Sequence, residues 1–156
     1  MKLHPVQSLS HTDLILTDVP TGAVVTVSCD ASWSPWNGDA AGAIVVDFGS
    51  LRPAVGFTCE LDAISPHMAE ALTIAKAIRF CRAKQLDVRL IKSDAKYVID
   101  ELKGRRPYSC LDTKHIIEYI RKNLGDTGLQ WVPRGRNQSP DALARSRNYS
   151  RTQKPR

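Results

Sequence analysis

Apolar and polar side chains alternate strictly over residues 24–30. Val25, Val27 and Cys29 occupy one side of this pattern, and β-branched residues, which favour extended backbone, dominate it. The pattern therefore predicts a strand over residues 23–31, with a carboxylate near its exit.

Two further apolar runs follow, each after a short turn sequence. They predict strands at residues 41–48 and 53–59, with Gly49-Ser50 as the turn between them. Consecutive strands joined by short turns pair in antiparallel fashion, so we expect a three-stranded meander. Residues 1–22 show no sustained periodicity and are interpreted as an N-terminal extension.

A helix is predicted to begin at Ser65-Pro66, with Ser65 as its N-cap, and to end near Gln85. Its expected buried stripe consists of Met68, Leu72, Ala75 and Ile78. The remaining pattern predicts a strand at 88–91, a helix capped by Asp94 and ending at Leu102, a helix at 111–123, a strand at 129–132 and a last helix from Asp141. The order βββαβααβα corresponds to an α/β fold, a mixed five-stranded sheet with helices on both faces.

Length and composition favour one globular domain, because 156 residues can bury a single core. No apolar run is long enough to span a bilayer, and we expect no membrane partner. The cysteines have neither a zinc pattern nor a disulfide framework, which favours reduced thiols and a cytoplasmic location. We expect a monomer.

The net charge of +6 is concentrated at the C-terminal end. The last twelve residues contain five cationic side chains and no acid. We expect residues 148–156 to form a basic, disordered tail. This tail is interpreted either as part of a surface for a polyanion or as a solvated end that aids solubility.

Four carboxylates fall where the predicted elements can bring them together: Asp30, Glu70, Asp94 and Asp141. Parallel strands that end at one edge of a sheet would place Asp30 and Asp94 side by side. Converging carboxylates need a counter-charge, and oxygen ligands favour Mg²⁺ or Mn²⁺. Purely structural roles are the alternative for each acid. Asp30 could open a turn, Glu70 could complement a helix dipole, and Asp94 and Asp141 could be N-caps.

The local sequences around these acids resemble type 1 ribonuclease H. The similar segments are C-D-A-S-W at 29–33, A-G-A-I-V-V at 41–46, M-A-E-A-L at 68–72, S-D-A-K-Y-V-I at 93–99 and W-V-P-R…N-Q-S-P-D-A-L-A at 131–144. Each motif is weak alone, but four on the expected elements are specific. The resemblance covers residues 23–147, which we take as the domain.

The resemblance implies a ribonuclease H-like fold and an endonuclease that cuts the RNA strand of RNA–DNA hybrids with two Mg²⁺ ions, with Mn²⁺ as a substitute. It implies that Asp30 bridges both metals. Glu70 and Asp94 would complete the site of the leaving-group metal, and Asp141 the site of the metal that activates water. Two metals about 4 Å apart suit an in-line displacement.

The sequence departs from many relatives in lacking a histidine in the loop before the last acid, where Arg134, Gly135 and Arg136 stand. It resembles the branch without that histidine. By resemblance or by charge, the expected substrate contacts are Asn37, Ser65, His67, Lys96, Arg105, Arg106, Arg134, Arg136 and Asn137.

Two alternative functions share the same fold. One is a nucleic-acid-binding domain without catalysis, and the other is an integrase-like enzyme that processes DNA. The four acids argue against a pure binder, because negative charge beside phosphates weakens binding. The sequence leaves open whether double-stranded RNA is also a substrate.

Overall fold

The computed structural model describes residues 19–108 and 110–134 of the chain. In chain order these residues form β1 (Val24–Trp33), β2 (Ala40–Asp47), β3 (Val55–Leu61), α1 (Pro66–Ala83), β4 (Asp87–Ser93), α2 (Lys96–Leu102), α3 (Leu111–Asn123) and β5 (Gly128–Trp131). The predicted order is confirmed through the fifth strand. The helix expected from Asp141, most of the N-terminal extension and the basic tail lie outside the described residues, and the domain limits at 23 and 147 stay predictions.

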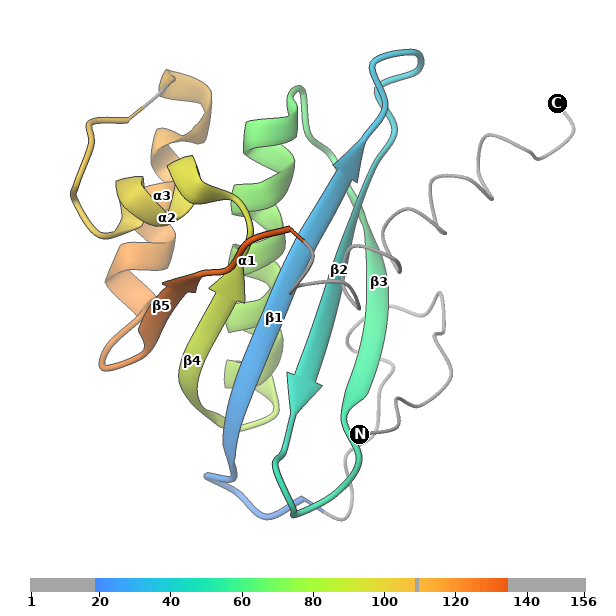
Figure 1. Cartoon of the computed structure of the whole chain (residues 1–156), viewed down its shortest axis with the longest axis vertical. Coiled ribbons are helices and arrows are strands. Elements are labelled where there is room, and N and C mark those ends of the chain that lie inside the picture. Colours follow the sequence, from blue (N-terminus) through green and yellow to red (C-terminus); the bar gives the residue numbers. More distant parts are fainter. Residues whose placement is uncertain (1–18, 109, 135–156) are drawn as a thin grey trace, which may run out of the picture.

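The five strands form one mixed sheet in the order β3-β2-β1-β4-β5 (Figure 1). β2 pairs antiparallel with both β1 and β3, which confirms the meander. β4 pairs parallel with β1 and with β5. β1 is thus the central strand, and β4 ends at Ser93 beside Cys29, whereas β1 continues to Trp33.

The helices pack together beside this sheet. α1 contacts β1, β2 and β4, and α3 packs against α1, with α2 between α3 and the end of β5. Figure 1 shows α1 behind β1 and β4, with α2 and α3 beside it. The helix predicted to begin at Asp141 lies outside the described residues, so the prediction of helices on both faces is not tested by them. Within them, no helix has the length and apolar character needed to cross a membrane.

The core confirms the alternation in β1, because Val25, Val27 and Cys29 are all buried. They pack with side chains from β2, β3 and α1, and the rings of Phe57 and Phe80 stack with centroids 4.8 Å apart. The sequence pattern of this strand therefore identified its inward face correctly.

The predicted buried stripe of α1 is largely wrong. Of its four members only Ile78 is buried, and the inward face consists instead of Ala69, Ala71, Thr73, Ile74, Ala77, Ile78, Phe80 and Cys81. The reason is a close approach to β2: a Cβ added to Gly42 would lie 2.5 Å from the Thr73 hydroxyl oxygen. This contact turns Thr73 and its neighbour Ile74 toward the sheet, and Met68 and Leu72 lie at the flank of the helix, half-buried.

Candidate active site

Asp30 lies inside β1 and is completely buried. It pairs with Ala43 of β2, and its Oδ1 accepts a hydrogen bond of 2.9 Å from the backbone N–H of Ala31. Because β1 continues to Trp33, the interpretation of Asp30 as a turn-opening residue is wrong. Burying a carboxylate in the middle of a strand is costly, which indicates a role beyond local structure.

Asp94 reaches the same place from β4. Cys29 and Ser93 are partners in the parallel ladder, so the acids that follow them emerge side by side. The predicted N-cap role of Asp94 is wrong, because the N-cap of α2 is Ala95, which has no side-chain cap. The Ser93 hydroxyl accepts the hydrogen bond from the Ala95 N–H instead, at 3.1 Å.

Glu70 is delivered by α1, and the close packing of this helix on β2 brings it within reach of the strand acids. Carboxylate oxygens of Asp30, Glu70 and Asp94 all lie within 4.8 Å of one another. No acidic residue occupies the first turn of α1, so the helix-dipole explanation of Glu70 is not supported. Ser65 is the N-cap as predicted, since its hydroxyl accepts from the Met68 N–H at 3.1 Å. Asp141 lies outside the described residues.

Crowding of negative charge changes the proton affinity of Glu70. Burial raises the pKa of Glu70 from 4.5 to about 8, and the charge of Asp94 adds to the rise. A hydrogen bond with Asp30, the charge of Arg134 and a hydrogen bond with the Ala31 backbone oppose it. Without a cation, the three carboxyl groups therefore do not all lose their protons at neutral pH.

The donor set fits a hard divalent cation. Glu70 Oε2 and Asp94 Oδ2 are buried and make no hydrogen bond within the described residues. Among the described residues, Asp94 forms an ion pair with Arg134, whose Nε lies 3.8 Å from Oδ2. The Arg134 side chain is 70 % exposed, and that of Asp94 is 4 % exposed. Buried carboxylate oxygens left without a close donor are the kind of ligand that Mg²⁺, Mn²⁺ or Ca²⁺ prefers.

The neighbouring thiols do not belong to this ligand set. Burial, followed by the influence of Cys81 and Glu70, raises the pKa of the Cys29 thiol well above 9.0. Burial alone raises the pKa of Cys81 to about 12. Both therefore stay protonated, and neither offers the thiolate that a soft metal or a nucleophilic mechanism requires.

The proton affinity of Glu70 predicts how stability depends on pH in the absence of metal. Between pH 4.5 and about 8 the folded protein retains a proton that the unfolded chain has released, so raising the pH penalises the folded state. In chelator, we expect the melting temperature to fall by roughly 5–10 °C over this interval. Thermal melts of the wild type and Glu70→Gln test this, because the variant should lack that part of the decline; equal slopes would contradict it.

The described residues include several of the proposed substrate contacts. Lys96 and Arg105 are exposed, and the Arg106 guanidinium lies 4.3 Å from the centroid of the Tyr97 ring. Asn37 is exposed in the β1–β2 turn, where its Oδ1 accepts from the Asp39 N–H at 2.9 Å. Arg136 and Asn137 lie outside the described residues. None of these contacts is tested by the structure, and they stay predictions.

Sequence reasoning missed one charged group, Glu101 of α2. It is 1 % exposed, and its Oε1 lies 2.7 Å from Nε2 of His67. A signal was present, because Glu101 falls three residues after Val98 and beside Leu102, within the apolar stripe of this short helix. A charge inside such a stripe indicates a buried partner.

Comparison with known proteins agrees with this geometry. The model of the reverse transcriptase-like family matches residues 28–147. No curated protein sequence matches the chain.

Among solved structures, RNase H1 of the halophilic archaeon Halobacterium salinarum NRC-1 is similar with a TM-score of 0.73 and 20 % identity, covering 81 % of this chain and 98 % of that one. The N-terminal RNase H domain of a Mycobacterium tuberculosis protein has a TM-score of 0.71 and 17 % identity, over 85 % and 98 %. LC11-RNase H1, isolated from compost and solved with an RNA/DNA hybrid, has a TM-score of 0.67 and 12 % identity, over 78 % and 94 %. The chain therefore belongs to the reverse transcriptase-like family and has the ribonuclease H fold, which confirms the resemblance to type 1 ribonuclease H.

Proposed function

We propose that this protein is a metal-dependent endonuclease that hydrolyses the RNA strand of RNA–DNA hybrids. The observation that carries the proposal is the convergence of Asp30, Glu70 and Asp94, three buried or half-buried acids with oxygens within 4.8 Å. The complex of LC11-RNase H1 with an RNA/DNA hybrid supports the choice of substrate.

These three acids, together with Asp141 by resemblance, would hold two Mg²⁺ ions, or Mn²⁺ as a substitute. When bound, such ions supply an activated water and neutralise charge on the phosphate during an in-line displacement. Asp30 is fixed by β1 and Asp94 by the end of β4, so the chain presents its ligands on rigid elements. Rigid placement limits the reorganisation needed when substrate arrives.

The chain also supplies the charge that attracts a polyanion to this end. Arg134 lies 3.8 Å from Asp94, Lys96 begins α2 two residues after Asp94, and Arg105 and Arg106 follow the end of that helix. We propose that the protein acts as a monomer and that double-stranded RNA is a poorer substrate than the hybrid. Contacts of this kind are made to phosphates, so affinity should decrease with salt.

The test compares three labelled duplexes of one sequence: hybrid, double-stranded RNA and double-stranded DNA. We expect cleavage of the RNA strand of the hybrid with Mg²⁺ and no cleavage with chelator. Binding without cleavage would favour the nucleic-acid-binding alternative. Cutting of the DNA duplex would favour an integrase-like activity.

Arg134 is expected to steer phosphate and to take no part in proton transfer, because an arginine does not release a proton at neutral pH. Arg134→Ala should raise KM for the hybrid about tenfold, with kcat nearly unchanged and partial recovery at low salt. Steady-state kinetics at two salt concentrations check this. A fall in kcat at saturating hybrid with unchanged KM would show that Arg134 stabilises the transition state instead.

The basic end of the sequence is expected to supply affinity only. Removing residues 147–156 should weaken hybrid binding and reduce the slope of log affinity against log salt by roughly two to three, because four cationic residues are lost. A salt titration by fluorescence anisotropy measures this slope. An unchanged slope would assign the tail to solubility.

A further inference from the structure

We propose that Glu101 is a positioning residue for substrate recognition, which acts by holding the imidazole of His67 against the RNA strand. This inference rests on the proposed function and adds to it a residue that no sequence motif indicates. It follows from the burial of Glu101, from its contact with His67 and from where that contact lies.

Burying the side chain of Glu101 costs free energy of folding. Its side chain has no exposed surface, and its neighbours in α2 are the buried Val98 and Leu102. A carboxylate in such surroundings is retained only with a partner of suitable charge or hydrogen-bonding capacity. One partner of Glu101 is His67, whose Nε2 lies 2.7 Å from Oε1 of Glu101.

His67 is also in an unusual position for a residue paired with an acid. It is the second residue of α1, whose N-cap is Ser65, and positive charge is disfavoured at a helix N-terminus. Helix stability alone therefore does not account for a histidine beside an acid here. The contact with the buried carboxyl group of Glu101 fixes the ring.

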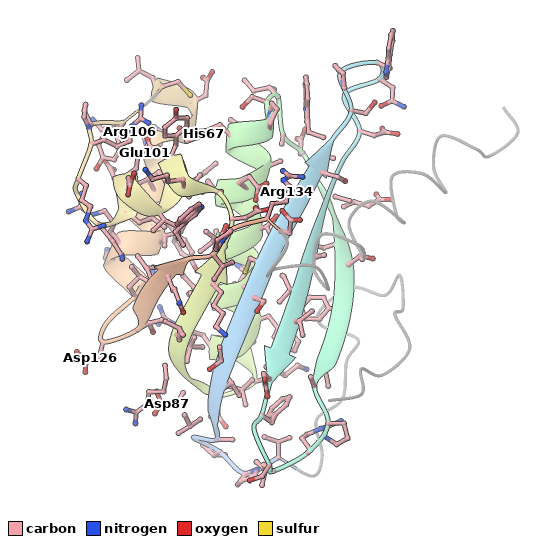
Figure 2. The ribbon with its side chains drawn as sticks, viewed as in Figure 1. His67, Asp87, Glu101, Arg106, Asp126 and Arg134 are labelled. Atoms are coloured by element: carbon pink, nitrogen blue, oxygen red, sulfur yellow. The ribbon has the colours of Figure 1, made fainter. Side chains whose placement is uncertain are left out.

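The pair lies beside the proposed active site. His67 precedes Glu70 of the carboxylate cluster by one helical turn, so both belong to the beginning of α1. Figure 2 shows His67, Glu101, Arg106 and Arg134 at one end of the molecule, whereas Asp87 and Asp126 lie at the other end. A duplex bound over the cluster would pass this end of α1.

The chemistry of the pair selects the group that it meets. A separation of 2.7 Å between Nε2 and Oε1 of Glu101 is too short for two unprotonated acceptors, so a proton lies between these two atoms. Nε2 is buried, and the side chain of His67 is 22 % exposed, so the exposed surface belongs to the rest of the ring. The other nitrogen, Nδ1, accepts a hydrogen bond in the neutral ring and donates one in the charged ring.

A ribose 2′-hydroxyl satisfies both states of Nδ1, because it donates and accepts. Phosphate oxygens only accept, and a DNA strand has no such hydroxyl. The pair therefore favours the RNA strand of the hybrid. Glu101 never touches the substrate; it keeps the ring in one orientation and one tautomer, as outer carboxylates do for metal-binding histidines.

The test uses the full chain with His67→Ala, Glu101→Gln and the double variant, and Asp87→Asn as the control. Asp87 pairs with Arg89 at 3.0 Å on the exposed far end of β4, so its loss removes an ion pair of similar geometry away from the substrate. We expect His67→Ala to raise KM for the hybrid about tenfold and Glu101→Gln about threefold, with kcat within twofold of wild type. The double variant should match His67→Ala, because Glu101 acts only through the ring.

A second measurement does not depend on cleavage. In chelator, binding is compared for the hybrid, for a hybrid whose RNA strand carries 2′-fluoro groups, and for DNA duplex. We expect the wild type and Asp87→Asn to prefer the 2′-hydroxyl hybrid, and His67→Ala and the double variant to lose that preference. The double variant also serves if His67→Ala, which removes the contact between His67 and the buried Glu101, fails to fold.

Several outcomes would overturn the inference. The first is a Glu101→Gln variant with a lower melting temperature but an unchanged KM and an unchanged 2′-hydroxyl preference. The second is an effect of Glu101→Gln on KM that is the same with and without His67. The third is a fall in kcat at saturating hybrid. If the wild type binds the hybrid with this preference but does not cut it, the proposed nuclease activity fails and the positioning role stands.

Discussion

Asp30→Asn is expected to abolish cleavage of the hybrid, lowering kcat/KM by about a thousandfold or more. Each tenfold loss corresponds to about 1.4 kcal/mol, and ligands of catalytic metals support several kcal/mol of transition-state stabilisation. Asp30 is the central acid of the cluster, since it is fully buried in β1 and hydrogen-bonds Glu70. The amide of asparagine keeps the shape but removes the negative charge that a divalent cation needs.

The same variant should fold and bind hybrid nearly as well as the wild type. Removing the negative charge of Asp30 from the crowded carboxyl groups relieves repulsion, so the melting temperature in chelator should not decrease. Asp126→Asn is the matched control, because Asp126 is exposed in the turn before β5, at the far end of the molecule (Figure 2). Substantial Mg²⁺-dependent activity in Asp30→Asn, measured on purified protein with a labelled hybrid, would refute the assignment of the centre.

Gly42→Ala is expected to lower both stability and activity, because β2 and α1 touch at this glycine. The added methyl group would meet Thr73 Oγ1 at 2.5 Å, and Thr73 is held by a 2.8 Å hydrogen bond to the Ala69 carbonyl oxygen. Overpacking of this kind costs about 1–3 kcal/mol, or roughly 3–10 °C in melting temperature for a domain of this size. Glu70 lies on the same helix three residues before Thr73, so displacing α1 should also reduce kcat.

Two further variants make the mechanism of this loss testable. Thr73→Ala removes the two side-chain atoms nearest the new methyl group, so the double variant should be more stable than Gly42→Ala alone. Gly128→Ala in β5 is the comparison, because its nearest neighbour is the Leu90 methyl group at 3.3 Å, which can move. Thermal unfolding of the wild type, Gly42→Ala, the double variant and Gly128→Ala measures these differences in stability. A Gly42→Ala variant as stable as the wild type would exclude a tight contact between β2 and α1.

Sequence alone predicted the parts of the fold that depend on local chemistry. The alternation in β1, the Ser65 cap of α1 and the chain order of the elements through β5 are confirmed. The meeting of Asp30 and Asp94 was also predictable, because it needs only the rule that parallel strands end together. Charge and position together were enough to indicate three members of the carboxylate cluster.

The features that sequence reasoning missed depend on packing between elements. Periodicity selects large apolar residues, so it placed Met68 and Leu72 in the core of α1, whereas contact with Gly42 turns a different face of the helix toward the sheet. The His67–Glu101 pair needs two helices to come together, which no local pattern reports. The proposed substrate contacts stay predictions for the same reason: they depend on a second molecule.

The parallel pairing of β1 with β4 has a consequence for the order of folding. β2, β3 and α1 all lie between these two strands in the sequence, so the pairing is non-local and costs more chain entropy than the hairpins do. Asp30 and Asp94 stay apart until it forms, and the chain has no complete cation site before that step. A divalent cation would then have little to bind in the folding transition state if this pairing is completed late. Its stabilisation would be expressed as slower unfolding and a longer-lived native state, with little acceleration of folding.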